Sequence, residues 1–226
     1  MNKFYHCVPY LIQNLFFLTF LPFYKFFLRL EIIGTENLKE IKGPIIIAPN
    51  HTSELDPTVI PLIFPFLSLK LPIYSVIYPI EKYKTKDWKW KRFIYGKLFF
   101  NLLGGYSTYS GHKDYEISLE NHIGLLKLGR TVCIFPEGKC TTDGNLGRAR
   151  GGLGFLAART NSVIIPLVIN TFYGITIRDL LFRRRKVVLT VLPPIYPGSL
   201  NVNINSSPIE FKNIGQMVLD QIDKHL

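Results

Sequence analysis

A histidine and an aspartate five positions apart form the pair of residues best suited to acid–base chemistry. His51 and Asp56 follow the apolar run 44–49. On an ideal helix two residues at this spacing point about 140° apart, so they meet only where the chain bends. A turn between a strand and a helix provides that bend, and there the carboxylate would hold one ring nitrogen and raise the basicity of the other. The pair therefore predicts a general base. The alternative is that Asp56 caps a helix beginning at Pro57 and His51 is an ordinary loop histidine.

A second group of reactive side chains follows the apolar run 131–135. A Pro-Glu-Gly turn there projects the carboxylate of Glu137, which could accept hydrogen bonds from hydroxyl groups. Lys139, Arg148 and Arg150 follow on a glycine-rich stretch whose charges suit a phosphate. Taken alone, Glu137 is better explained as part of a solvated turn.

Several common catalytic motifs are absent from the sequence. The dipeptide Gly138–Lys139 lacks the earlier glycine of a phosphate-binding loop, and no Gly-x-Ser-x-Gly elbow occurs. The five His and three Cys residues have no zinc-ligand spacing, so no metal site is expected.

Short apolar runs alternate with helical patterns along the chain, and this alternation indicates how the reactive loops are positioned. The expected strands are 44–49, 73–78, 131–135, 163–169 and 186–192, and the expected helices are 57–66, 87–103, 113–128, 152–160 and one after the capping box that begins at Ser207. Continuous apolar strands between helices predict an α/β fold with a mostly parallel central sheet flanked by helices. In such folds the loops at the carboxyl ends of the strands hold the ligand site.

The composition restricts the classes of partner. The chain has 226 residues, a formal net charge of +11 and 47% hydrophobic residues. This apolar content excludes a disordered basic tail. A basic and apolar protein has two natural anionic partners, which are nucleic acid and an anionic membrane surface.

The first 30 residues are unusually aromatic and contain no acidic side chain. Ten aromatic residues lie there, and the uncharged stretch 4–24 is interrupted by Pro9, the pair Gln13–Asn14 and Pro22. Its unbroken apolar run, 15–21, is much shorter than the ~20 residues that cross a bilayer. We therefore expect residues 1–30 to form a helical segment that docks in the membrane interface, and residues 31–226 to form the main domain. A membrane-spanning helix and an ordinary buried helix are the alternatives.

Two further segments concentrate basic residues. Residues 82–97 interleave lysines with aromatic side chains, and residues 183–186 form the run Arg-Arg-Arg-Lys. Both suit an anionic lipid surface or the phosphates of coenzyme A. Single-stranded nucleic acid and a plain solvated surface are the alternatives, although no nucleic-acid-binding motif is present.

Three sequence blocks occur together in an order that resembles a known family. Asn50, His51 and Asp56 match the block Asn-His-x4-Asp, residues 135–138 match Phe-Pro-Glu-Gly, and Ile165–Pro166 match a later Ile-Pro block. The chain in this way resembles the glycerolipid acyltransferases, which include the lysophosphatidic acid acyltransferases.

The resemblance implies a mechanism in phospholipid biosynthesis. His51, oriented by Asp56, would take a proton from a glycerol hydroxyl, which then attacks an acyl thioester of coenzyme A or of an acyl-carrier protein. Glu137 would bind acceptor hydroxyls, Gly138 would allow close backbone approach, and Pro166 would lie on the acyl-donor side. No metal or redox cofactor is implied. The expected location is the cytoplasmic face of a membrane, with no nucleic-acid partner.

One departure from the family pattern concerns the acceptor phosphate. The family has an arginine in the stretch that corresponds to residues 104–113, where this sequence has none. Lys139 and Cys140 also replace the usual Thr-Arg after Phe-Pro-Glu-Gly. Lys113, Lys139, Arg148 or Arg150 could supply the missing charge, although lysine is a less directional phosphate ligand than arginine. The acceptor is therefore expected to be lysophosphatidate or another lyso-lipid, and a catalytically silent membrane-binding protein is the alternative.

Overall fold

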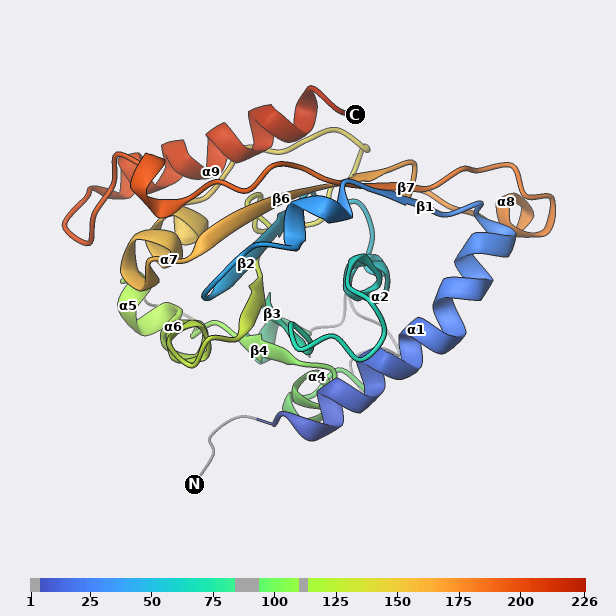
Figure 1. Ribbon diagram of the computed structural model, residues 1–226, viewed down its shortest axis with the longest axis horizontal. Coiled ribbons are helices and arrows are strands. Elements are labelled where there is room, and N and C mark those ends of the chain that lie inside the picture. The colour runs from blue at the N-terminus through green and yellow to red at the C-terminus, as the bar shows by residue number, and fades with distance from the viewer. Residues whose placement is uncertain (1–4, 84–93, 110–113) are drawn as a thin grey trace.

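A seven-stranded sheet forms the centre of the protein (Figure 1). The computed structural model describes residues 5–83, 94–109 and 114–226. The strands are β1 (Glu31–Ile33), β2 (Ile45–Pro49), β3 (Ile73–Ile77), β4 (Gly105–Ser107), β5 (Thr131–Cys133), β6 (Val163–Asn170) and β7 (Val188–Val191). Their order across the sheet is β1-β7-β6-β2-β5-β3-β4, and every pair is parallel except β6 with β7. The predicted α/β fold with a mostly parallel sheet is therefore confirmed.

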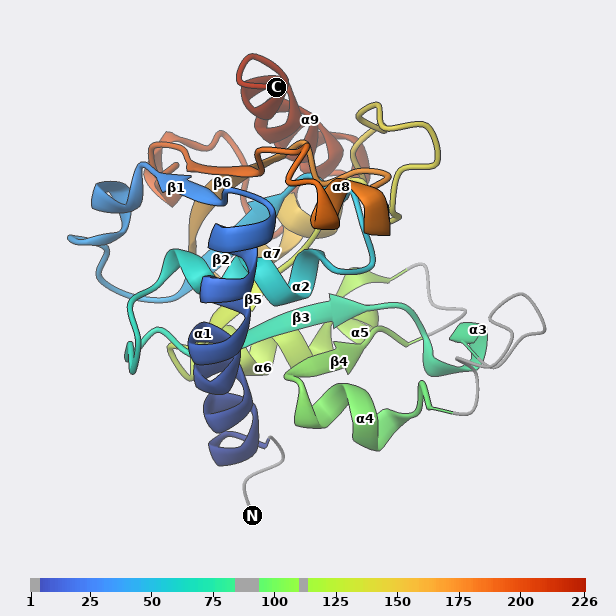
Figure 2. The same ribbon diagram turned by 90° about the vertical axis from the view of Figure 1, so that its right-hand side faces the viewer.

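Helices cover both faces of the sheet (Figures 1 and 2). They are α1 (Cys7–Phe27), α2 (Asp56–Val59), α3 (Ile80–Tyr83), α4 (Lys97–Leu102), α5 (Tyr115–Ser118), α6 (Glu120–Lys127), α7 (Gly152–Thr160), α8 (Ile177–Leu181) and α9 (Pro208–Asp223). Short 3-10 helices occupy Thr35–Leu38, Ile60–Ile63 and Pro197–Ser199. The side chains of β2 alternate between the two layers. Ile46 and Ala48 join the core beneath α6, α7 and α9, while Ile45 and Ile47 join the core beneath α1 and α2.

Some predicted helices differ from the observed ones. The helix expected at 57–66 is α2 followed by a 3-10 turn, and the one expected at 113–128 breaks at Leu119 into α5 and α6. The helix expected at 87–103 is helical over Lys97–Leu102, and residues 94–96 before it are not helical. Residues 84–93, which include most of the predicted Lys/Trp segment, lie outside the described residues.

Helix α1 is longer than the apolar run in its sequence suggested. It continues through Pro22 for 21 residues with mean hydropathy 1.3, and 22% of its most apolar window is buried. By length and composition it is able to cross a membrane, so interface docking stays a prediction and a membrane-spanning helix stays its alternative.

The inner face of α1 packs into the same core as the sheet. Tyr24 is buried, and so is Leu28 directly after the helix. Gln13 accepts a hydrogen bond from the amide of Ile73 and donates one to its carbonyl, both at 2.8 Å. The boundary between a docking segment 1–30 and a domain 31–226 stays a prediction.

Candidate active site

The loop between β2 and α2 brings His51 and Asp56 into contact. Nδ1 of His51 donates a hydrogen bond to Oδ2 of Asp56 over 2.8 Å. The same oxygen accepts hydrogen bonds from the amides of Thr52 at 2.8 Å and Ser53 at 3.0 Å, and Oδ1 accepts one from the Thr52 hydroxyl at 3.0 Å. Asp56 is fully buried, so its charge is stabilised by these four donors. The contact predicted from the spacing therefore exists, and Asp56 binds the imidazole although it is also the first residue of α2.

Asn50 hydrogen-bonds the start of this loop to the sheet. Its side-chain amide donates to the carbonyl of Ile169 at 3.0 Å and its side-chain oxygen accepts from the amide of Ile169 at 2.7 Å. Asn50 is itself buried. The asparagine therefore fixes the end of β2 against β6 and places His51 at the carboxyl edge of the sheet.

The surroundings of His51 favour the protonated ring. Burial lowers the pKa of His51, but hydrogen bonds to Asp56 and to the Cys140 thiol outweigh burial and raise that pKa from 6.5 to about 9. The ring of Phe135 stacks on the imidazole with centroids 3.8 Å apart and planes inclined by 16°. The imidazole is thus held from one edge by Asp56 and on one face by Phe135. This arrangement suits a strong general base.

Glu137 connects the loop between β5 and α7 to the His51 loop through hydrogen bonds to backbone amides. Its Oε1 accepts from the amide of His51 at 2.9 Å, and its Oε2 accepts from the amide of Gly147 at 2.6 Å. Only 3% of this residue is exposed. Glu137 therefore positions the His51 loop, and its contact with acceptor hydroxyls stays a prediction.

Gly138 and Arg150 lie against each other beside this carboxylate. Gly138 has a φ of +66°, and a Cβ built there would come within 2.7 Å of Cδ of Arg150. The amide of Arg150 donates to the carbonyl of Pro136 at 2.8 Å, which ties the arginine to the same turn. Burial raises the pKa of Tyr78, which follows β3, and the neighbouring guanidinium of Arg150 opposes that rise. Among the basic residues predicted to bind the acceptor phosphate, the structure therefore places Arg150 against the Pro-Glu-Gly turn.

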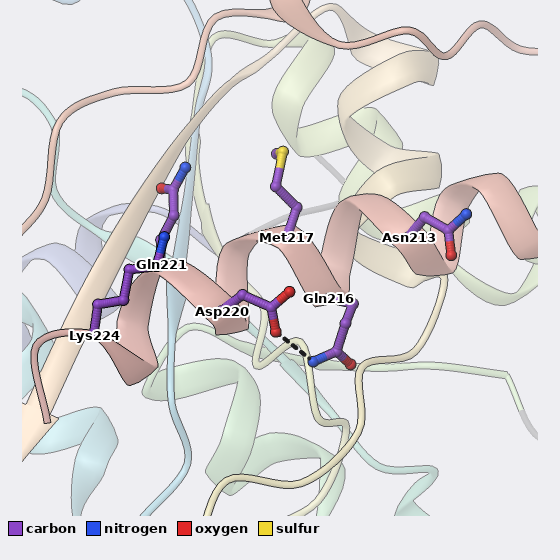
Figure 3. A pocket seen from close by; sticks show the side chains of 6 residues that line it. All are labelled: Asn213, Gln216, Met217, Asp220, Gln221 and Lys224. Atoms are coloured by element: carbon purple, nitrogen blue, oxygen red, sulfur yellow. Dashed lines mark hydrogen bonds between the residues drawn. The ribbon is translucent and has the colours of Figure 1, made fainter.

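Helix α9 packs against the backbone of Ala149 and Arg150. The Gln216 side-chain oxygen accepts a hydrogen bond from the amide of Ala149 at 3.1 Å, and a Cβ at Gly215 would come within 2.8 Å of the Arg150 carbonyl oxygen. Gln216 also donates to Asp220 at 2.9 Å, as Figure 3 shows.

The pocket drawn in Figure 3 has a volume of about 460 Å³ and is lined by Asn213, Gln216, Met217, Asp220, Gln221 and Lys224. None of the predicted site residues lines this pocket, so it is not the catalytic cleft.

The remaining predicted residues have different environments. Lys139 and Arg148 are exposed, as is Arg150. Pro166 is buried within β6 and pairs with Ala48 of β2, three positions before His51. Its predicted role toward the acyl donor stays a prediction. Lys113 lies outside the described residues.

Two of the His51 contacts that were missed from the sequence differ in whether a signal could have found them. One is the stacking of Phe135, and the other is the hydrogen bond that the amide of Thr141 donates to the His51 carbonyl at 2.9 Å. The first has a signal, since Phe135 belongs to the Phe-Pro-Glu-Gly block. The second has none, because a backbone amide is present at almost every residue.

Comparisons with known proteins identify the class. The Acyltransferase family matches residues 29–170, which is more than half of the chain. The protein therefore belongs to the Acyltransferase family, and the resemblance to glycerolipid acyltransferases is confirmed.

The similar proteins carry consistent names. The chain is 29% identical over 168 residues to the chloroplastic 1-acyl-sn-glycerol-3-phosphate acyltransferase LPAT1 of Arabidopsis thaliana, covering 74% of this chain and 41% of the plant protein. It is 23% identical over 207 residues to the 1-acyl-sn-glycerol-3-phosphate acyltransferase of Borreliella burgdorferi, covering 88% and 72%. The chain thus spans about two fifths of the length of the plant relative.

A solved structure shares the fold. The 1-acyl-sn-glycerophosphate acyltransferase PlsC from Thermotoga maritima has a TM-score of 0.63 and 20% sequence identity, covering 96% of this chain and 79% of that one.

Proposed function

We propose that this protein transfers a fatty acyl group from an acyl thioester to the free hydroxyl of a lysophosphatidate-like lyso-glycerolipid in phospholipid biosynthesis. The donor is acyl-coenzyme A or an acyl-carrier protein. The observation that carries the proposal is the His51–Asp56 pair at 2.8 Å, at the carboxyl edge of the sheet in a member of the Acyltransferase family. The names of the relatives support the choice of acceptor.

The pair supplies the chemistry of a direct transfer. Asp56 holds the proton on Nδ1 of His51, so Nε2 is the atom that accepts the proton of the acceptor hydroxyl. The hydroxyl oxygen attacks the thioester carbonyl, and the C–S bond breaks as the tetrahedral intermediate collapses. The leaving thiolate then takes the proton from the imidazolium. The products are a new ester and a free thiol, and His51 returns to its neutral form.

We assign the acceptor phosphate to Arg150. Its side chain lies over Gly138, directly beside the turn that holds the His51 amide through Glu137. Arginine binds phosphate through two parallel hydrogen bonds, which gives a fixed orientation to the glycerol carbons. Lys139 and Arg148 are the nearby exposed alternatives.

We place the enzyme at the cytoplasmic face of an anionic membrane, with α1 as its docking or spanning helix. The outer face of α1 exposes Leu11, Leu15 and Leu18 by 55–66%. The inner face contacts α2, the helix that begins at Asp56, because the hydroxyl groups of Tyr24 and Thr58 lie 2.7 Å apart. Cysteines are free throughout the chain, as a reducing compartment requires.

The test is acyl transfer by purified protein. Acyl-coenzyme A and acyl-carrier protein are offered separately with a panel of lyso-lipids, and products are measured by lipid mass spectrometry. We expect turnover by the wild type and its loss in His51→Ala, whereas vesicle binding persists. His225→Ala, which changes an exposed histidine at the end of α9, is the matched control. Full activity of His51→Ala would exclude this mechanism.

A catalytically silent membrane-binding protein is the second candidate. It is favoured by one observation, the absence of the family's arginine between residues 104 and 113. Turnover on any acceptor of the panel eliminates it. Salt-sensitive retention on single-stranded nucleic acid without vesicle binding would instead indicate a nucleic-acid-binding protein.

A further inference from the structure

Helix α8 exposes a compact group of large apolar side chains. Ile177, Leu181 and Phe182 are 75%, 66% and 67% exposed. We call these three residues the α8 tip. Large apolar side chains gathered on one short element are a typical sign of a contact surface.

The exposure of the α8 tip belongs to an ordered element. Thr176 and Asp179 form a capping box that starts α8, and Asp179 also lies 3.7 Å from the guanidinium of Arg185. Ile175 and Leu180 pack inward against the core layer beneath α1. The helix is therefore held by one side while the α8 tip projects from the other.

Arginines surround the α8 tip. Arg178, Arg183 and Arg184 are exposed, and the guanidinium of Arg184 lies 5.2 Å from the ring centre of Phe182. Arg185 and Lys186 are compensated by ion pairs with Asp179 and Glu31. Apolar side chains with cations at their edge suit an anionic lipid surface, where the apolar groups enter the acyl region and the cations meet phosphates.

The α8 tip continues the surface of α1. The guanidinium of Arg183 lies 4.8 Å from the ring centre of Phe26, which is 57% exposed near the end of α1. Figure 2 shows α1 and α8 together in front of the sheet, on the side of the molecule that faces right in Figure 1. Both elements can thus touch one plane.

We propose that the α8 tip and its arginines form a second membrane contact, which inserts into an anionic bilayer beside α1. This inference rests on the proposed function, because it supplies the orientation that interfacial catalysis needs. A single surface helix leaves the protein free to roll about the helix axis. A second contact at the end of α1 prevents rolling and keeps the His51 loop facing the lipid layer from which the acceptor comes.

The experiment measures binding of the full-length protein to phosphatidylcholine vesicles with and without phosphatidylglycerol. Ile177→Ser/Leu181→Ser/Phe182→Ser should weaken binding to anionic vesicles about 10-fold or more, since three apolar side chains no longer insert. The matched control is Ile204→Ser/Ile209→Ser, which removes exposed apolar side chains before and at the start of α9. It should bind as the wild type does.

A second set of variants tests the cations. Arg178→Gln/Arg183→Gln/Arg184→Gln should lower binding to anionic vesicles at least about 10-fold, leave binding to neutral vesicles unchanged and reduce the salt dependence. Lys212→Gln/Lys224→Gln on α9 is the control. If the triple serine variant does not fold, Leu181→Ser alone should lower binding about threefold.

The outcomes separate this inference from the proposed function. Turnover on a short-chain lyso-lipid dissolved as monomers should be unchanged in all these variants, because the chemistry does not need the bilayer. Wild-type vesicle binding by the serine and glutamine variants, or no vesicle binding by the wild type, overturns the second contact while turnover leaves the proposed function standing. Absence of turnover by the wild type on every acceptor overturns the proposed function itself.

Discussion

Replacing Asp56 by Asn tests how the His51–Asp56 pair works, because it removes the charge and leaves the shape. Oδ2 accepts from the amides of Thr52 and Ser53 as well as from His51, so the Asn oxygen should take that position. The Asn amide group would then take the place of Oδ1 and donate to the Thr52 hydroxyl, which can also act as an acceptor. The imidazole tautomer is kept, and the variant isolates the effect of the negative charge.

The magnitude follows from the pKa of His51. Burial lowers this pKa, while hydrogen bonds to Asp56 and Cys140 raise it to about 9. A general base acts in its neutral form, so wild-type kcat/KM should rise about tenfold per pH unit below that value, or about 100-fold from pH 6 to pH 8. Without the carboxylate, burial is opposed mainly by the Cys140 contact, and the pKa should fall to near or below 6.5. The variant should then gain no more than about fivefold over the same range.

The assay is initial-rate acyl transfer at several pH values for wild type and Asp56→Asn with one acceptor. Because both enzymes use the same acceptor, the effect of its phosphate titrating cancels in the ratio of the two kcat/KM values. Asp223→Asn, at the exposed end of α9, is the control and should follow the wild type. A wild-type profile that is flat between pH 6 and pH 8, or an Asp56→Asn profile parallel to it, would refute the proposed pair.

Three further predictions concern other side chains. Glu137→Gln places an amide group against the amide of His51 or Gly147, so kcat should fall about tenfold or more and stability by about 1–3 kcal/mol, measured by steady-state kinetics and urea unfolding. Arg150→Ala should raise KM for a phosphate-bearing acceptor about 10- to 100-fold with little change in kcat, whereas the exposed Arg148→Ala should not. Burial lowers the pKa of His122 to about 4, so the folded protein loses stability as the pH falls below 6.5. In His122→Leu the loss of unfolding free energy from pH 7 to pH 5 should be about 2 kcal/mol smaller than in the wild type, as measured by urea unfolding.

Each of these predictions has a contrary outcome. A rise in KM at unchanged kcat in Glu137→Gln would favour contact with the acceptor hydroxyls over positioning of His51. Equal effects of Arg148→Ala and Arg150→Ala would remove the assignment of the phosphate to Arg150. If His122→Leu and the wild type lost the same unfolding free energy between pH 7 and pH 5, His122 would not be the cause of that loss.

The parts of the fold that were predicted have strong local signals. The continuous apolar run of β2 and the capping box of α9 specify their elements from a few neighbouring residues. Strand β4 was missed, because its three residues, which begin at the second of two glycines, carry almost no local preference and pairing with β3 creates the strand. The break at Leu119 is likewise invisible in the helical pattern.

The candidate site likewise has contacts that could be predicted from the sequence and contacts that could not. The spacing and residue types of His51 and Asp56 allowed their contact, and the resemblance to the glycerolipid acyltransferases made it the prediction. The partners of Glu137 are the amides of His51 and Gly147, and neither can be recognised from a side chain. The approach of Arg150 to Gly138 depends on how the loop closes over twelve residues, and the packing of α9 against Ala149 and Arg150 contributes to that closure without any local sequence signal.

Gln13 has a practical consequence for work with a soluble form of this protein. Its side chain hydrogen-bonds the amide and carbonyl of Ile73 as a neighbouring strand would, and Tyr24 fills part of the core. Deleting the N-terminal helix would leave the amide and carbonyl of Ile73 without these partners and open a hydrophobic hole, and the shortened chain should aggregate. A soluble form is better obtained by retaining the helix and replacing its outward leucines, such as Leu11 and Leu18, with polar residues.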